Sequence, residues 1–518
     1  MDVKNLEDQL AKFIYELETE DRLVRVGLKE KAETAKIYKK YQKLFTKEVL
    51  EGIQNQIDQL RRSSPQGRTI NSSSSGSGDG RRNREVQIDI LERIYFTIAG
   101  SFIGLKTAGL SDSIKTYFSK AKAKVAGEDL AYFDIQPRIA KETIFEKRES
   151  LDDAVSPVVA KINPKQLELL RGEIDLIKSL GFAGYLDYFA KNKKVDYSGF
   201  YKISQRIAKE TDNVWQKTMS RVSREVLGRP FKNIRACHLG YLRSLAMFDN
   251  FYPKDKVVST FLAFAKNLGL ADLLSRVEID DKDRPRKNPR AVCYWPKPPE
   301  EIHLVIKPIG GEQDFEAMFH EGGHALHGAA VDTKLPYALK TLSRSGALTE
   351  TYAFVLEDLV FDPLWLSTYL NVSSYSAQRI QKQAYFVNLM MLRRYLGKFS
   401  YEYEMFSSGK ISAGPEIYKR SLEIVTGFVH RKINWLSDMD SRFYSVDYLR
   451  AWIAAAQIKD YLIRRFGSKW FVNPRAGKFL RNLFARGVTD EVEEVIRQLG
   501  YKPWDISLLI ESYKTVLR

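Results

Sequence analysis

The chain has 518 residues, of which 44% are hydrophobic and 28% charged; these values are ordinary for a soluble globular protein and exclude disorder as its dominant state. Lys and Arg total 82 against 65 for Asp and Glu, and the resulting net charge of +17 suits either a nucleic-acid-binding protein or a basic, solvated surface. No dense basic run with interleaved aromatic residues occurs, so we favour the solvated surface and do not expect nucleic acid as a partner.

The start of the chain is polar and lacks the apolar core of a signal peptide, and no apolar stretch is long enough to span a bilayer. We therefore expect a cytoplasmic protein without membrane contact. The two cysteines, Cys237 and Cys293, lie far apart in the sequence, which excludes a disulfide framework and a cysteine zinc cluster.

Helical periodicity dominates the first half of the chain. Apolar residues recur at intervals of three or four over residues 6–17, and residues 86–275 give a similar pattern, interrupted by Pro and Gly. The Ser/Gly-rich segment 65–84 has little to bury and predicts a mobile loop. We expect a mainly α fold with an N-terminal helical region over residues 1–225 and a catalytic region over 226–518, or one integrated unit.

The clearest strand candidate is residues 302–308, which are rich in β-branched side chains and end at a Pro-Ile-Gly-Gly turn. A strand shortly before the helix described next could hydrogen-bond an extended peptide along its edge. Leu304, Val305 and Ile306 are therefore the candidate substrate-binding residues. His303 lies alone in this strand, and we expect it to be packed or on the surface rather than to bind metal.

Residues 314–330 predict a helix that carries His-Glu-x-x-His. His320 and His324 are four residues apart, so they lie on one helix face and can direct imidazole nitrogens at one ion, for which zinc is suited. Glu321 is rotated by about 100° from His320 and can reach a water in the site instead, which makes it the candidate general base. Gly322 and Gly323 each cost about 1 kcal/mol in a helix interior, and close packing or close substrate approach is the usual explanation.

A catalytic zinc site commonly has three protein ligands, so one more is needed. His327 lies about 10 Å along the helix axis from His320, too far to share its ion, and suits a position behind the ligands or in the packing. Ala330 occupies the position where a third histidine of the metzincin pattern would stand. Glu350 and Glu357, seven residues apart on one face of a second helix, remain: we expect Glu350 as the third ligand, and Glu357 as the acceptor that orients a zinc histidine.

The run from His320 to His327, followed by Glu350 and Glu357, resembles the oligopeptidase F and thimet oligopeptidase family of zinc peptidases, as does the basic run 286–293. The match covers about residues 281–460. The resemblance implies a two-lobed helical shell around a deep substrate channel, a small β-sheet next to the zinc helix, one zinc ion per chain, and cleavage of short peptides rather than folded proteins.

The resemblance also implies tyrosines that donate hydrogen bonds to the carbonyl oxygen under attack. Tyr448 is the first candidate and Tyr444 the second. The sequence departs from the family pattern where Arg442 replaces a histidine and Arg450 replaces a later tyrosine.

The expected reaction is hydrolysis of internal bonds of short peptides by a zinc-dependent oligoendopeptidase. One alternative is a metallocarboxypeptidase resembling the carboxypeptidase Taq family, in which Arg442 or Arg450 would hold a substrate carboxylate. Thr351, Tyr352 and Ala353 stand where that family usually has a serine-bearing motif, which weakens this reading. The other alternative is a basic nucleic-acid-binding protein with structural zinc.

Overall fold

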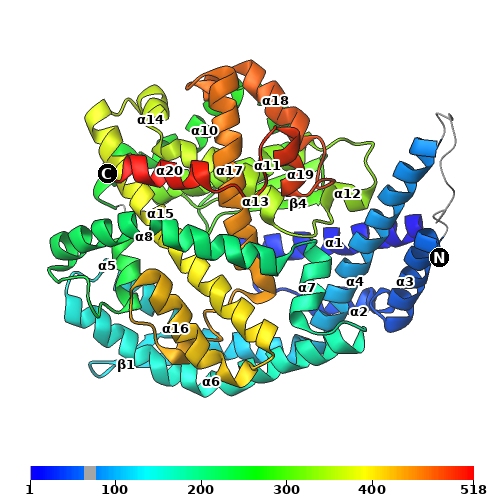
Figure 1. The fold of residues 1–518 in the computed structure, drawn as a ribbon, viewed down its shortest axis with the longest axis horizontal. Helices are drawn as coiled ribbons and strands as arrows, with labels where there is room; N and C mark the ends of the chain where they lie inside the picture. The colour runs from blue at the N-terminus through cyan, green and yellow to red at the C-terminus, as the bar shows by residue number, and fades with distance from the viewer. Residues whose placement is uncertain (1, 63–76, 245) are drawn as a thin grey trace.

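The computed structural model describes residues 2–62, 77–244 and 246–518 and is mainly helical, with two small sheets in the described part of the chain (Figure 1). Helices α10 (Val257–Asn267), α11 (Glu312–Ala330) and α13 (Ala347–Glu357) lie in the upper half of the view in Figure 1, and the long helix α6 (Phe145–Ser179) runs along its lower edge. The expectation of a mainly α protein with a small β-sheet is confirmed.

Besides short 3-10 turns, the helices in chain order are α1 (Val3–Arg25), α2 (Thr34–Lys40), α3 (Lys47–Arg62), α4 (Ser77–Lys120), α5 (Tyr132–Lys141), α6 (Phe145–Ser179), α7 (Tyr185–Lys193), α8 (Tyr197–Leu227), α9 (Leu239–Leu242), α10 (Val257–Asn267), α11 (Glu312–Ala330), α12 (Tyr337–Thr341), α13 (Ala347–Glu357), α14 (Pro363–Leu370), α15 (Ser374–Ser408), α16 (Gly414–Thr426), α17 (Tyr444–Phe466), α18 (Pro474–Phe484), α19 (Val492–Gln498) and α20 (Ser507–Val516).

Two buried apolar clusters make up most of the core. The larger joins the N-terminal helices to α8, α15 and α17, with Leu10, Trp215 and Leu392 among its fully buried members. The second surrounds α11 and α13 and includes Phe264 and Phe319. The expected domain boundary at residues 225 and 226 falls inside α8, and the larger cluster draws side chains from both sides of it.

The segment 65–84 lies partly outside the described residues. From Ser77 onward it belongs to α4, so the expectation of a loop is wrong for residues 77–84. Adding a residue to an existing helix costs far less than nucleating a new one, and α4 can therefore extend into a sequence with little to bury.

One of the two sheets lies against α11. Its strands are β3 (Val277–Asp280), β4 (Val292–Lys297) and β5 (Glu301–Val305), in the order β3-β5-β4, with β3 parallel and β4 antiparallel to β5. The other sheet is a hairpin of β1 (Lys122–Val125) and β2 (Glu128–Ala131), distant in sequence from α11.

The expected strand at 302–308 is confirmed for residues 302–305, which belong to β5, but its expected pairing with a substrate along a free edge is wrong. β5 is the central strand and is paired on both sides. The side chains of Leu304, Val305 and Ile306 are at most 2% exposed, and the Ile306 N–H donates to the carbonyl of Asp280 at 3.0 Å. A continuous apolar run is typical of a strand that is covered on both faces, which is why these residues are internal and cannot pair with a substrate.

β4 is the edge strand on one side of this sheet, and α1 packs against it. The hydroxyl of Tyr294 in β4 donates a hydrogen bond to the carboxylate of Asp21 in α1. The N-terminal helix therefore helps to cover the sheet that supports α11. No helix of the described chain has both the length and the apolar character needed to cross a bilayer.

Candidate metal centre

Two buried glycines let α11 sit unusually close to its neighbours. A Cβ added at Gly322 would lie 2.2 Å from the ring of Phe261 in α10, and one at Gly323 would lie 2.7 Å from Cα of Ala353 in α13. Neither glycine has a φ in the left-handed region, so their role is the close approach rather than an unusual backbone. Of the two explanations for these glycines, the structure supports close packing.

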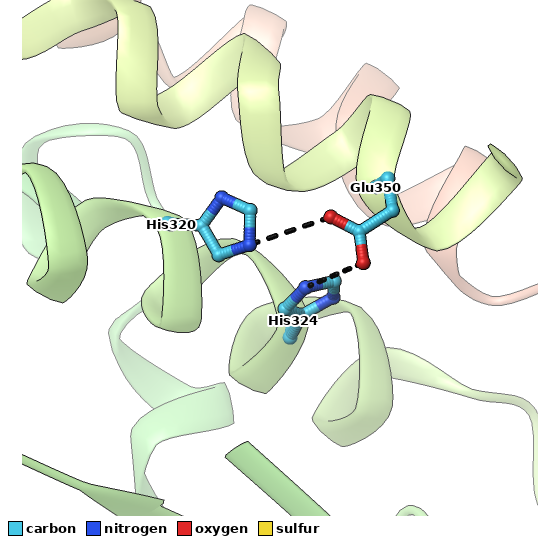
Figure 2. Close-up of side chains that lie close together, drawn as sticks. All are labelled: His320, His324 and Glu350. Carbon is cyan, nitrogen blue, oxygen red and sulfur yellow. Dashed lines mark ion pairs between the residues drawn. The ribbon is translucent and has the colours of Figure 1, made fainter. Parts of the chain in front are cut away.

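This close approach brings His320 and His324 of α11 next to Glu350 of α13 (Figure 2). The Nε2 atom of His320 lies 3.4 Å from Oε2 of Glu350, and Nε2 of His324 lies 3.9 Å from Oε1. One potential ligand atom from each residue falls within 4.8 Å of the others. No other set of three His, Cys, Asp or Glu residues in the described chain meets this criterion.

Glu350 is buried, and its side chain is a negatively charged carboxylate. Its Oε1 accepts a hydrogen bond from the Tyr444 hydroxyl at 2.8 Å, whereas Oε2 has no hydrogen-bond partner. Burial by itself raises the pKa of Glu350, but the two imidazoles beside it, those of His320 and His324, outweigh this effect and lower the pKa to about 2. A buried carboxylate oxygen without a partner is costly unless a cation binds it.

Glu357 holds His320 from the opposite side. Its Oε2 lies 2.6 Å from Nδ1 of His320, so the imidazole donates from Nδ1 and keeps Nε2 free to face Glu350. Burial raises the pKa of Glu357 to about 7. The arrangement is the one expected from the spacing of the two glutamates, and it fixes the ring orientation that a ligand needs.

Glu321 is half-buried and does not belong to the three-residue cluster. Burial raises the pKa of the Cys293 thiol in β4, and the nearby negative charge of Glu321 adds to this rise. No described residue forms a hydrogen bond or ion pair with this carboxylate. It is therefore available to a molecule that enters the site.

His327 has a packing role. It is fully buried between Trp295 and Tyr352, with ring centroids 4.8 and 4.9 Å away, and its Nε2 pairs with the carbonyl of Gly487 at 3.1 Å. Burial lowers its pKa to about 3, so it stays neutral. Of the two positions expected for His327, the structure places it in the packing.

The two candidate tyrosines are on the first turns of α17, beside α13. Tyr444 contacts Glu350 directly, and the ring of Tyr448 lies 5.0 Å from that of Tyr444 and 5.4 Å from that of Phe354. Burial and the nearby charge of Glu350 raise the pKa of both phenols, so both keep their protons and remain hydrogen-bond donors.

The two arginines of this segment differ in availability. Arg450 is 2% exposed, and its guanidinium donates to both carboxylate oxygens of Glu493 at 2.8 and 2.7 Å. Arg442 is exposed, and none of the described residues pairs with its guanidinium. Arg450 therefore has a structural role, and only Arg442 can reach a ligand.

Sequence reasoning missed Asp447, which connects three helices around the centre. Its Oδ2 accepts from the backbone N–H of Gly346, at the start of α13, at 3.1 Å, and from Nζ of Lys193 in α7 at 2.6 Å. A negative charge at a helix N-terminus is stabilising, and here it anchors the helix that carries Glu350. Lys193 and Asp447 are separated by 254 residues, and no local pattern signals their contact.

The cluster fits a zinc ion by the chemistry of its atoms. Two imidazole nitrogens and one carboxylate oxygen are common zinc ligands, with bonds of about 2.0–2.2 Å, and a tetrahedral ion places such atoms roughly 3.4 Å apart. The observed separations of 3.4 and 3.9 Å between the histidine nitrogens and Glu350 are close to that value. Three protein ligands leave a fourth position open, as catalytic sites require.

The sequence matches no known family model and no curated protein. Among solved structures, the fold is similar to a protein described as oligoendopeptidase F from Bacillus anthracis strain Ames, with a TM-score of 0.62 and 14% identity over 93% of this chain and 85% of that one. PZ peptidase A with an inhibitor gives 0.65 and 13%, over 93% and 86% of the two chains. Another structure described as oligoendopeptidase F gives 0.66 and 13%, over the same shares.

The chain shares the fold of these peptidases. At this level of identity the likeness concerns the fold alone, and it confirms the helical architecture that the sequence resemblance implied.

Proposed function

We propose that this protein is a zinc-dependent peptidase that hydrolyses internal bonds of short peptides. The observation that carries the proposal is the convergence of His320, His324 and Glu350 next to the unpaired carboxylate of Glu321. A structural zinc site is usually closed by four protein ligands, often thiolates, and no fourth ligand joins this cluster among the described residues. The fold neighbours named as peptidases support the same class of reaction.

Bound zinc would supply Lewis acidity, polarising the scissile carbonyl and making a nearby water easier to deprotonate. His320, His324 and Glu350 would hold the ion, with Glu357 fixing the orientation of His320 through Nδ1.

Glu321 would accept a proton from the attacking water and pass it to the nitrogen of the leaving amine, which is general base and then general acid catalysis. Tyr448 would donate its hydroxyl proton in a hydrogen bond to the carbonyl oxygen as negative charge develops there. Tyr444 is the second candidate for that role, although its hydroxyl already donates to Glu350.

Replacing Glu321 with glutamine removes the base while preserving the size of the side chain. We expect turnover of a peptide mixture to fall by about 10³-fold, while zinc content stays near one ion per chain. Glu168→Gln, an exposed glutamate on α6, is the matched control and should cleave as the wild type does. Substantial activity in the Glu321 variant would disprove the assignment of the base.

Replacing Glu350 with alanine should instead lower zinc content, measured by elemental analysis after dialysis against buffered zinc. Unchanged zinc content would show that another residue is the third ligand. Identification of the products with and without a chelator would test the reaction itself: cleavage within peptides that have a blocked C-terminus supports an endopeptidase, and the chelator should abolish it.

A further inference from the structure

A cavity of about 800 Å³ lies beside the metal centre, between α4 and α7 on one side and the segment 439–447 on the other. Its wall includes Tyr444, which donates to Glu350, and Gly346, where an added Cβ would lie 3.7 Å from Cγ of Glu350. The volume is typical of a pocket that holds a small ligand or a short piece of peptide.

The wall of this cavity combines aromatic rings with cations, and nearly every cation is already paired. Arg344 donates to Asp89 and Glu92, and Arg93 donates to Asp89 and to the carbonyl of Leu342. These contacts tie α4 to the segment before α13, so both arginines serve the fold.

Lys193 is also paired with an acidic side chain. Its Nζ lies 2.6 Å from Oδ2 of Asp447 in a buried ion pair. Arg442 is the remaining cation among the described lining residues, and it has no hydrogen-bond or ion-pair partner for its guanidinium. Burial raises the pKa of Glu173, and the nearby charge of Arg442 only partly offsets this rise; the two side chains do not form an ion pair.

The backbone at Arg442 is held in an uncommon conformation. Arg442 and Phe443 both have left-handed φ values, 67° and 52°, which few residues other than glycine adopt. The N–H of Arg442 donates to the hydroxyl of Tyr185 at 2.8 Å, and Phe443 is 1% exposed, with its ring 4.6 Å from that of Tyr197. Strained positions of this kind persist where the surroundings enforce them, and they are concentrated at binding and catalytic sites.

We propose that Arg442 binds a carboxylate of the substrate in this cavity and so selects peptides by the charge at one end. The inference rests on the proposed peptidase function and adds a substrate class to it. A guanidinium matches a carboxylate with two parallel hydrogen bonds, and Phe96, Tyr188 and Phe189 supply apolar wall for the adjoining side chain. The carboxylate comes from the C-terminus of a short peptide or from an acidic side chain near it.

The test uses a short, internally quenched peptide with an apolar last residue, prepared as the free acid, as the C-terminal amide, and as an amide ending in glutamate. For the wild type we expect kcat/KM for the free acid to exceed that for the apolar amide by about 10- to 100-fold, the range for a hydrogen bond between charged groups. Arg442→Gln should bring this ratio close to one, and Arg442→Lys should restore part of it. Arg224→Gln, an exposed arginine on α8, is the matched control and should keep the wild-type ratio.

If the wild type cleaves neither the free acid nor the glutamate amide faster than the apolar amide, the proposal is overturned. It is also overturned if Arg442→Gln keeps the wild-type preference, because a purely structural role would change all three substrates equally. If only the glutamate amide is cleaved better than the apolar amide, the carboxylate is that of a side chain; if only the free acid is, the carboxylate is the C-terminus. If both are, Arg442 accepts a carboxylate from either source. If the wild type cleaves none of the three, the proposed peptidase function fails. In that case, calorimetric titration with the same peptides measures their affinities and tests the role of Arg442 separately. Tighter binding of a peptide with a carboxylate, lost in Arg442→Gln, supports the proposed role of Arg442. Equal affinities for all three peptides overturn it.

Discussion

Replacing Gly323 with alanine should weaken both the fold and the metal centre, although alanine is the better helix former. The new Cβ would lie 2.7 Å from Cα of Ala353, whereas ordinary contacts begin at 3.4 Å, so α11 and α13 must separate by about 0.7 Å. Overpacking of this kind costs about 1–3 kcal/mol, and the better helix propensity of alanine returns about 1 kcal/mol. Metal–ligand distances tolerate only about 0.2 Å, so the displacement of Glu350 from the two histidines should weaken zinc binding by about tenfold or more.

Gly172→Ala is the matched control. Gly172 is also in a helix interior, in α6, but an added Cβ there meets no atom within 4 Å. It should therefore show the gain in helix propensity without the clash, and be more stable than the wild type by up to about 1 kcal/mol. The free energy of unfolding of Gly323→Ala should therefore be lower than that of Gly172→Ala by about 1–3 kcal/mol.

The free energy of unfolding is measured by urea titration of the metal-free protein, and zinc affinity by competition with a chelator. If Gly323→Ala is as stable as Gly172→Ala and binds zinc as the wild type does, then the contact of α11 with α13 does not set the geometry of the centre.

Two further predictions concern the tyrosines and the N-terminal helix. Tyr448→Phe should lower kcat by about 10²-fold and leave the zinc content unchanged. Tyr444→Phe loses the hydrogen bond to Glu350 and should lower zinc affinity by about tenfold. If Tyr444→Phe instead lowers kcat and Tyr448→Phe lowers zinc affinity, the two roles are exchanged. Burial of Glu18 against β4 raises its pKa from 4.5 to about 7, so the folded protein holds this proton more tightly than the unfolded chain does. The stability that comes from this difference is complete below pH 4.5, is lost as the pH rises to about 7, and amounts to at most about 3 kcal/mol. Glu18→Gln should therefore be more stable than the wild type at pH 8 by up to that amount, with the advantage absent at pH 4; equal urea midpoints at pH 8 would contradict the buried carboxyl.

The alignment of the candidate ligands within each helix was accessible from sequence. His320 and His324 share a face because four residues make about one helical turn, and Glu350 and Glu357 share one because seven make about two. The contact of Glu357 with His320 also agrees with expectation. These features depend on backbone periodicity, which acts over a few residues and is the same in every helix.

The position of each element within the fold could not be read in this way. The residue pattern over 302–308 predicts a strand, yet only the pairing with β3 and β4 makes that strand central and its side chains inaccessible. The sequence by itself does not distinguish Arg442 from Arg450. In the fold, Glu493 pairs with the guanidinium of Arg450, whereas the guanidinium of Arg442 has no partner among the described residues.

The chain by itself determined which residue types could form a metal site and on which helix faces they lie. Tertiary structure decided how closely the two helices approach, through Gly323 and Ala353, and how α13 is anchored, through Asp447 and Lys193. Such contacts join residues far apart in the chain and depend on the volumes and charges of whole elements packed together, whereas helical periodicity depends only on neighbours within a turn or two.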